Sequence, residues 1–528
     1  MDVHQLIPAT AGSVSIADTV FVILCSLLVL FMIPGLGFFY AGLDRKKYVM
    51  TMIMQSLVSI PITSIIWIFW GFGLAFGPNI GGGILGNPTH WLVWEVIVQH
   101  GYFTVDNVYA PHVPLIAFFI YQLMFAIITP PLMTGAFADR MTWGKYIVFI
   151  ILWQYLVYIP VCHWIWGGGF LAQIGVLDWA GGIVIHTTAG FGALATVLVL
   201  GKRKPLSKSK EASQSKNSSN VLVMLGIAFL WFGWFGFNSG GAMALNGQAL
   251  RGCINTALAP CFAMITWMIL EYSTHHRKMS ALSVAGSFVA GLAGITPCAG
   301  LVPIWAGFPI GAIVAIVSFG MVTLVKLNKH IDDAMDVFSV HGITGFVGAL
   351  LIGAFIVSPA PGLGGAPIMQ TASGVFAPAG LPAGIYNQAS TVINGTTYFT
   401  GGLMPGIYYS APTMAHGYQF GIELGAACLA AAWSFGWSAL LVFGITRVSK
   451  YLPWSLKEYR SSFEEEKVEE EEECTEDEKE PNGKEIIRSY NKQVYEDGSS
   501  KIVEKVIIID DDDKATEVDK ENHLPKKE

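Results

Sequence analysis

The segment "DWAGGIVIHTTAGFGAL" (Asp178–Leu194) places one histidine, His186, inside an otherwise apolar run. A second segment, "DAMDVFSVHGITGFVGAL" (Asp333–Leu350), repeats its pattern around His341. In both, an aspartate stands eight residues before the histidine, and a Gly-Phe pair begins four residues after it. Self-similarity of this kind indicates an internal repeat, with one copy of a functional unit in each half.

The composition around these segments is that of a membrane protein. Only 13% of the 528 residues are charged, against about 25% in a soluble domain. Apolar runs of about 20 residues, the length that crosses a hydrocarbon core, recur along the chain. We therefore predict an all-α polytopic membrane protein with eleven transmembrane helices, at roughly 18–41, 50–76, 114–138, 144–171, 180–201, 220–245, 257–273, 280–297, 303–325, 337–357 and 418–446.

The basic residues orient these helices. Lys and Arg follow the odd-numbered runs, whereas 77–113, 172–179 and 358–417 contain none, and Arg251 is the exception among the opposite loops. Positive-inside counting therefore predicts an external N-terminus and a cytoplasmic C-terminus. The start of the chain lacks a basic region, so we expect no cleavable signal peptide. Asn394, in an Asn-Gly-Thr sequon of the long external loop, is a possible glycosylation site.

The two repeat copies lie on the fifth and tenth runs, so their helices cross the membrane in opposite directions. This predicts an inverted 5+5 repeat plus one extra helix. Eight residues span about 12 Å of helix. His186 and His341 should therefore descend from opposite faces and pair near the midplane, each behind a repeat-related acidic residue: Asp178 in one copy, and Asp333, with Asp336 nearby, in the other.

Two neutral imidazoles in apolar surroundings suit a small polar cargo. Each ring has one donor and one acceptor nitrogen, so the pair can bond to each other and still offer polar sites to ammonia or water, or relay a proton. A bare ion fits poorly because its desolvation is costly. The alternative is that each histidine is a packing residue bonded to a neighbour, but polar residues in membrane helices generally face a pathway.

The tail differs from the rest of the chain. Residues 451–528 carry 13 basic and 25 acidic side chains. Like-charge blocks such as "FEEEKVEEEEECTEDEKE" predict a largely disordered cytoplasmic tail, although Asp497-Gly498 could close a hairpin. The seven cysteines show no CxxC or metal spacing, so we expect neither a metal nor a cofactor. Nothing in the chain indicates a nucleic-acid partner.

Six motifs stand in collinear order: "GLGFFYAGLDRKK" (Gly35–Lys47), "YQLMFAIIT" (Tyr121–Thr129), "WGGGFLAQIGVLDWAGGIVIH" (Trp166–His186), "WFGWFGFN" (Trp231–Asn238), "GLAGITPCAG" (Gly291–Gly300) and "DDAMDVFSVHGITG" (Asp332–Gly345). Together they resemble the ammonium transporter family, Amt/Mep/Rh. The resemblance spans about residues 18–446 and implies eleven helices, a homotrimer and one narrow pore per protomer. It implies a multi-pass plasma-membrane transporter, not an enzyme, that serves nitrogen uptake by moving ammonium or ammonia, and possibly methylammonium.

The resemblance also assigns roles to single residues. His186 and His341 match the twin pore histidines. Phe125 and Phe237 match the two aromatic gate residues, and Tyr121 lies one helical turn from Phe125. Trp166, together with Phe125, matches the outer recruitment site, and Asp178 matches the family's essential aspartate, which would help to attract cations. Trp166 is typical of the Amt/Mep branch. An aspartate at a helix start is also a common N-cap.

The chain departs from the family pattern in two places. Gly241 stands where a serine hydroxyl usually completes the recruitment site, so either Ser239, two residues earlier, compensates or the site has fewer ligands. The tail lacks the usual Gly-Leu-Asp…His-Gly-Glu pattern, which puts regulation between subunits through it in doubt.

Three other functions are alternatives to this interpretation of the sequence. An Rh-like gas channel is disfavoured by Trp166, and an ammonium sensor would signal to cytoplasmic regulators through the acidic tail. A membrane metalloenzyme would need three or more clustered ligands, and His163, His275 and His276 do not obviously join the pair.

Overall fold

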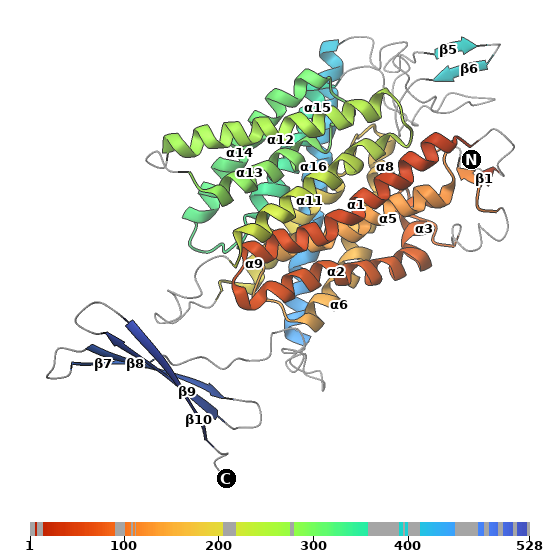
Figure 1. Cartoon of the computed structure of the whole chain (residues 1–528). Coiled ribbons are helices and arrows are strands. Elements are labelled where there is room, and N and C mark those ends of the chain that lie inside the picture. The colour runs from red at the N-terminus through yellow and green to blue at the C-terminus, as the bar shows by residue number, and fades with distance from the viewer. Residues whose placement is uncertain are drawn as a thin grey trace. The chain divides into compact units, whose positions relative to one another are not determined.

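The computed structural model describes residues 6–7, 14–89, 101–106, 109–110, 112–203, 218–274, 279–356, 390–393, 396–399, 412–448, 474–479, 485–494, 500–509 and 515–524. The chain divides into two compact units, Met1–Tyr459 and Arg460–Glu528. The first is a bundle of helices and the second holds strands (Figure 1).

The helices of the first unit are α1 (Ile16–Leu43), α2 (Val49–Ile66), α3 (Phe72–Phe76), α5 (Leu115–Leu132), α6 (Trp143–Trp153), α7 (Ile159–Ile165), α8 (Phe170–Gln173), α9 (Thr188–Leu200), α11 (Asn220–Ser239), α12 (Gly247–Thr274), α13 (Ala281–Ile295), α14 (Gly307–Leu327), α15 (Thr344–Phe355) and α16 (Pro412–Val448). Short 3-10 turns are η1 (Lys46–Tyr48), η3 (Met133–Gly135), η6 (Gly240–Ala242) and η7 (Ile304–Ala306). Four π-helical turns lie within or before these helices: η2 (Trp67–Gly71), η4 (Gln154–Tyr158), η5 (Gly182–Thr187) and η8 (Phe338–Ile343).

Within the described residues, ten helical stretches are long and apolar enough to cross a membrane. They coincide with ten of the eleven runs expected from the sequence. The remaining run, 280–297, forms α13, whose 15 residues fall short of the 20 or so that usually span a bilayer. The prediction of an all-helical, multi-pass membrane protein is confirmed at this level.

Small residues let the helices approach closely, as is usual where lipid offers no hydrophobic driving force for association. α1 and α11 lie side by side (Figure 1). A Cβ added at Gly226 of α11 would lie 2.4 Å from Phe39 N, and one at Gly233 would lie 2.2 Å from Met32 Cγ. These glycines therefore set the spacing between the two helices.

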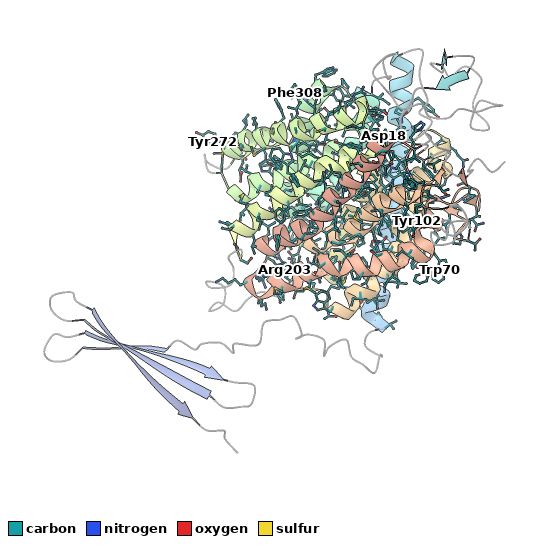
Figure 2. All side chains as sticks on the ribbon, turned by 45° about the vertical axis from the view of Figure 1, so that its right-hand side comes forward. Asp18, Trp70, Tyr102, Arg203, Tyr272 and Phe308 are labelled. Carbon is teal, nitrogen blue, oxygen red and sulfur yellow. The ribbon has the colours of Figure 1, made fainter. Side chains whose placement is uncertain are left out.

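Ion pairs join several connections at one end of the bundle. Asp332, before η8, accepts hydrogen bonds from Arg203 Nε at 3.1 Å and Nη2 at 2.9 Å, and Arg140 Nη1 lies 3.7 Å away. Burial raises the pKa of Asp332, but its bonds with Arg203 outweigh that effect and leave the pKa below its usual value. Arg203 lies at the opposite end of the bundle from Asp18 and Tyr102 (Figure 2).

Short antiparallel strand pairs accompany the helices. β1 (Leu6–Ile7) pairs with β4 (Val105–Asp106), β2 (Asn79–Ile80) with β3 (Leu85–Gly86), and β5 (Ser390–Ile393) with β6 (Thr396–Phe399). Asn394 of the sequon lies outside the described residues.

The second unit is a four-stranded antiparallel sheet, where the charge pattern had predicted disorder. Its strands β7 (Cys474–Lys479), β8 (Glu485–Val494), β9 (Ser500–Ile509) and β10 (Ala515–Leu524) follow the order β10-β9-β8-β7. Ile and Val concentrate in β8 and β9, and these residues favour strands. Val494 pairs with Ser500, and the turn expected at Asp497-Gly498 lies outside the described residues.

Candidate functional site

Asp178 caps the π-helical turn η5, which carries His186. Its Oδ1 accepts backbone N–H bonds from Gly181 at 2.9 Å and Gly182 at 2.7 Å. Its Oδ2 accepts from Ile183 at 2.8 Å and Val184 at 2.9 Å. Burial raises the pKa of Asp178 to about 6, although these four bonds oppose the rise. The carboxylate thus holds the start of the histidine's helix, where the helix dipole favours negative charge.

Asp333 does the same for η8, though with fewer bonds. Its Oδ2 accepts the Phe338 N–H at 2.8 Å, and its Oδ1 accepts no hydrogen bond from the described residues. Burial, and then the neighbouring Asp336, raise the pKa of Asp333 to about 7. Asp336 itself forms an ion pair with Lys326 at 2.8 Å. Both predicted acidic residues therefore belong to the connection before the second histidine.

The two histidines meet. His341 Nδ1 lies 3.3 Å from His186 Nδ1. The rings stack with centroids 5.2 Å apart and an interplanar angle of 14°. Both side chains are buried, with exposures of 1% and 2%, and His186 Nε2 has no hydrogen-bond partner among the described residues. An Nδ1–Nδ1 hydrogen bond needs one donor and one acceptor, so the two rings share a single proton between them.

Glycines on both helices allow this approach. A Cβ added at Gly190 would lie 2.1 Å from Gly342 Cα, and one at Gly345 would lie 2.6 Å from His186 Cβ. Gly190 and Gly345 occupy the same position in the two repeat copies, four residues after their histidines. Only glycine leaves room for backbones this close.

A cavity of about 10 Å³ surrounds the pair, close to the space that one water molecule needs. Apart from the imidazoles its lining is apolar, from α1, α5, α11 and α13. Trp234 stacks on His186 with centroids 5.4 Å apart, and its indole N–H donates to Thr296 Oγ1 at 2.8 Å. The sequence reasoning missed Trp234. Its signal was its place three residues before Phe237, on the same helix face.

The predicted gate residues lie next to the cavity. The rings of Phe125 and Phe237 meet edge to face, with centroids 4.5 Å apart. Tyr121 packs on Phe125 at 4.8 Å, and its hydroxyl donates to Phe237 O at 2.7 Å. Phe237 lies 6.2 Å from the His186 ring. The two phenyl rings, each 1% exposed, are thus buried beside the histidines.

Trp166 lies beyond this gate. Its ring centroid is 5.7 Å from that of Phe125, and its Nε1 donates to Asp178 O at 2.7 Å. The residue is 8% exposed. Trp166, Phe125 and Phe237 therefore form one continuous row that leads to the histidine pair.

Residues 20–472 match the model of the Ammonium Transporter Family. The chain belongs to this family. It is 40% identical over 361 residues to the ammonium transporter of Aquifex aeolicus, covering 68% of this chain and 81% of that protein. It is 42% identical over 337 residues to ammonium transporter 1 of Dictyostelium discoideum, covering 64% and 71%.

Solved structures agree with this assignment. The crystal structure of Saccharomyces cerevisiae Mep2 matches with a TM-score of 0.68 and 30% identity over 84% of this chain and 90% of that one. Candida albicans Mep2 gives 0.67 and 32% over 86% and 90%. The protein is thus an ammonium transporter, a membrane transporter rather than an enzyme.

Trp179 crowds position 241 in this ammonium transporter. A Cβ added at Gly241 would lie 3.0 Å from Trp179 O and 3.1 Å from Trp179 Nε1, and one at Gly300 would lie 2.2 Å from the same indole. The indole N–H donates to Asn238 O at 2.6 Å. The ring therefore fills the space beside Gly241. Ser239 Oγ is buried and has no hydrogen-bond partner among the described residues.

We predict that Gly241→Ser does not improve the apparent KM for ammonium. The new Cβ forces Trp179 against Gly300, and such overpacking typically costs about 1–3 kcal/mol. Gly241→Ala is the matched control, because it adds the same Cβ without a hydroxyl. Uptake assays should find both variants equally impaired. A KM below the wild-type value in Gly241→Ser alone would show that the site has room for a serine ligand.

Among the described residues, no group of three or more His, Cys, Asp or Glu is placed so that it could hold a metal ion. Both ring nitrogens of His163 have other partners: Nδ1 lies 2.8 Å from Ala75 O, and Nε2 lies 2.7 Å from Asn79 Oδ1. His275 and His276 lie outside the described residues.

Proposed function

We propose that ammonium is gathered beside Trp166 and crosses the membrane through this protomer past His186 and His341. The observation that carries the proposal is the 3.3 Å separation of the two Nδ1 atoms at a small, otherwise apolar cavity. Two buried imidazoles that bond to each other keep a polar line through an apolar passage.

Recruitment falls to the aromatic row. A cation over aromatic faces gains up to about 2 kcal/mol when it is partly desolvated, and Trp166 and Phe125 lie 5.7 Å apart. Asp178 adds negative charge behind Trp166 when it is ionised, and its carbonyl oxygen fixes the indole. Because position 241 is glycine, the recruitment site has fewer hydroxyl ligands than it would have with a serine there.

At the gate the ion gives up its proton, either to water on the recruitment side or to the histidine pair. The contact between Phe125 and Phe237 leaves no room for a hydration shell, and a bare cation in an apolar cavity is costly. Ammonia then passes Phe237 and reaches His186 Nε2, which has no partner among the described residues. The hydrogen-bonded pair carries it, or relays its proton, towards His341.

The same proposal covers the architecture. α13 is taken as the eleventh crossing, and the two Asp–His copies as halves of an inverted 5+5 repeat, with the N-terminus outside and the C-terminus in the cytoplasm. The Lys and Arg distribution and the π-helical turn at each histidine support this reading. We further propose a homotrimer in the plasma membrane, acceptance of methylammonium, a glycan at Asn394 and regulators that bind the tail.

Ion selectivity tests the proposed route past the two histidines. Expressed in a yeast strain that lacks its own ammonium transporters, the wild-type protein should restore growth on low ammonium. Excess potassium should not slow methylammonium uptake, because K⁺ has no proton to lose and must enter the cavity as an ion. Potassium flux comparable to ammonium flux would contradict the proposal.

A further inference from the structure

The outer turns of α16 bind the segment that leads into Asp178. Tyr418 Oη donates to Ile174 O at 3.3 Å, and Gln419 Nε2 donates to Gly175 O at 3.1 Å. Glu423 Oε1, one turn further on, accepts the N–H of Leu177 at 2.7 Å. Three side chains of a single helix therefore hold backbone groups at three of the four positions from Ile174 to Leu177.

Glu423 is the centre of the contact. It is fully buried, and its Oε1 accepts a second hydrogen bond, from Gln419 Nε2 at 2.6 Å. Its Oε2 accepts no hydrogen bond from the described residues. Burying a carboxyl group among helices is costly unless it makes good bonds. Both hydrogen bonds of Glu423 are accepted by Oε1, one from Gln419 of the same helix and one from Leu177 in the segment before Asp178.

The next residue along the chain belongs to the site. Asp178 follows Leu177, its carbonyl oxygen accepts the Trp166 indole N–H, and its carboxylate caps η5 through four N–H bonds. A shift of Leu177 therefore moves both the recruiting indole and the start of the helix that carries His186.

We propose that Glu423 is a positioning residue for ammonium recruitment, which acts through Oε1 as the anchor of Leu177 and Asp178. The inference rests on the recruitment role proposed for Trp166 and Asp178. It adds α16 to the elements that determine how well ammonium is captured, although no residue of α16 lines the histidine cavity.

The test compares two substitutions that differ in one property. Glu423→Gln keeps an oxygen acceptor for Leu177 and should leave the apparent KM for methylammonium within about twofold of the wild type. Glu423→Ala removes the acceptor and should raise KM roughly three- to tenfold, the effect of losing a hydrogen bond of this class, with a smaller change in the maximal rate per surface molecule.

A matched control lies on the same helix. Ser438 is also buried, but its Oγ accepts the Trp153 indole N–H at 3.0 Å, away from the recruitment segment. Ser438→Ala should therefore leave KM unchanged. Gln419→Met provides a second route if Glu423→Ala fails to reach the surface, because it removes the donors to Glu423 and Gly175 and should also raise KM.

The outcomes separate the anchoring of Leu177 by Glu423, here called the clamp, from the proposed function. A Glu423→Gln variant as impaired as Glu423→Ala would overturn the proposal, because charge or a proton would then matter and not the acceptor. A wild-type KM in Glu423→Ala would overturn it too. Trp166→Leu, measured in the same cells, is the reference. If KM rises in Trp166→Leu but not in Glu423→Ala, the clamp is wrong and the recruitment role of Trp166 stands. If it rises only in Glu423→Ala, the clamp stands and the role of the indole falls.

Discussion

Cells that depend on His186→Ala for ammonium uptake are expected to grow no better than cells without a transporter. Alanine removes one half of the Nδ1–Nδ1 hydrogen bond and leaves His341 as the only imidazole in an apolar cavity. Leaving a buried polar group unpaired costs about 1–3 kcal/mol, and each 1.4 kcal/mol is tenfold. We expect uptake at least about tenfold lower, measured with methylammonium in the yeast strain that lacks its own transporters.

His330→Ala is the matched control, because this histidine is exposed in the connection before η8. It should transport normally. Surface labelling must show both variants in the membrane at wild-type amounts. Normal uptake and unchanged selectivity in His186→Ala would mean that the histidine pair is a packing feature and that ammonium takes another route.

The second large effect is expected at the helix crossing beside the pair. In Gly190→Ala, the new Cβ would lie 2.1 Å from Gly342 Cα. The neighbour is backbone, so it cannot turn away as a flexible side chain would, and the two histidine helices must separate. Overpacking of this kind costs about 1–3 kcal/mol or more. We expect a lower melting temperature in detergent and several-fold less protein at the surface.

Gly286→Ala controls for the glycine change itself, because a Cβ added there meets nothing within 4 Å. In a helix, alanine in place of an unconstrained glycine usually stabilises by about 0.4–1 kcal/mol, so Gly286→Ala should melt at or slightly above the wild-type temperature. Equal melting temperatures for Gly190→Ala and the wild type would show that the crossing tolerates a wider gap.

The sequence predicted the helical, multi-pass fold because long apolar runs have few other solutions. It also pointed to the meeting of His186 and His341, since the repeated Asp–His spacing was visible in the letters. The π-helical turns that carry both histidines were not predictable, because they change the backbone register without any residue that demands it. The sheet of β7 to β10 was not expected, because the like-charge blocks favour disorder whereas the Ile and Val of β8 and β9 favour strands.

Other features depend on tertiary contacts that no local pattern reveals. The crowding at Gly241 comes from Trp179, which lies 62 positions earlier in the chain. Glu423 reads as an isolated acidic residue in an apolar run until Leu177 is seen opposite it. Trp234 was among sixteen tryptophans, and only its stack on His186 separates it from the others.

Because the two Nδ1 atoms face each other, the two ends of the histidine pair differ in hydrogen-bonding character. With both rings neutral, the ring that donates its Nδ1–H presents a bare Nε2 lone pair, and the ring that accepts must carry its proton on Nε2. The two outward-facing nitrogens are therefore always opposite in character, one acceptor and one donor. Reversing the order requires both rings to exchange protons together. Ammonia that takes the proposed route would therefore meet an acceptor nitrogen at one end of the pair and a donor nitrogen at the other.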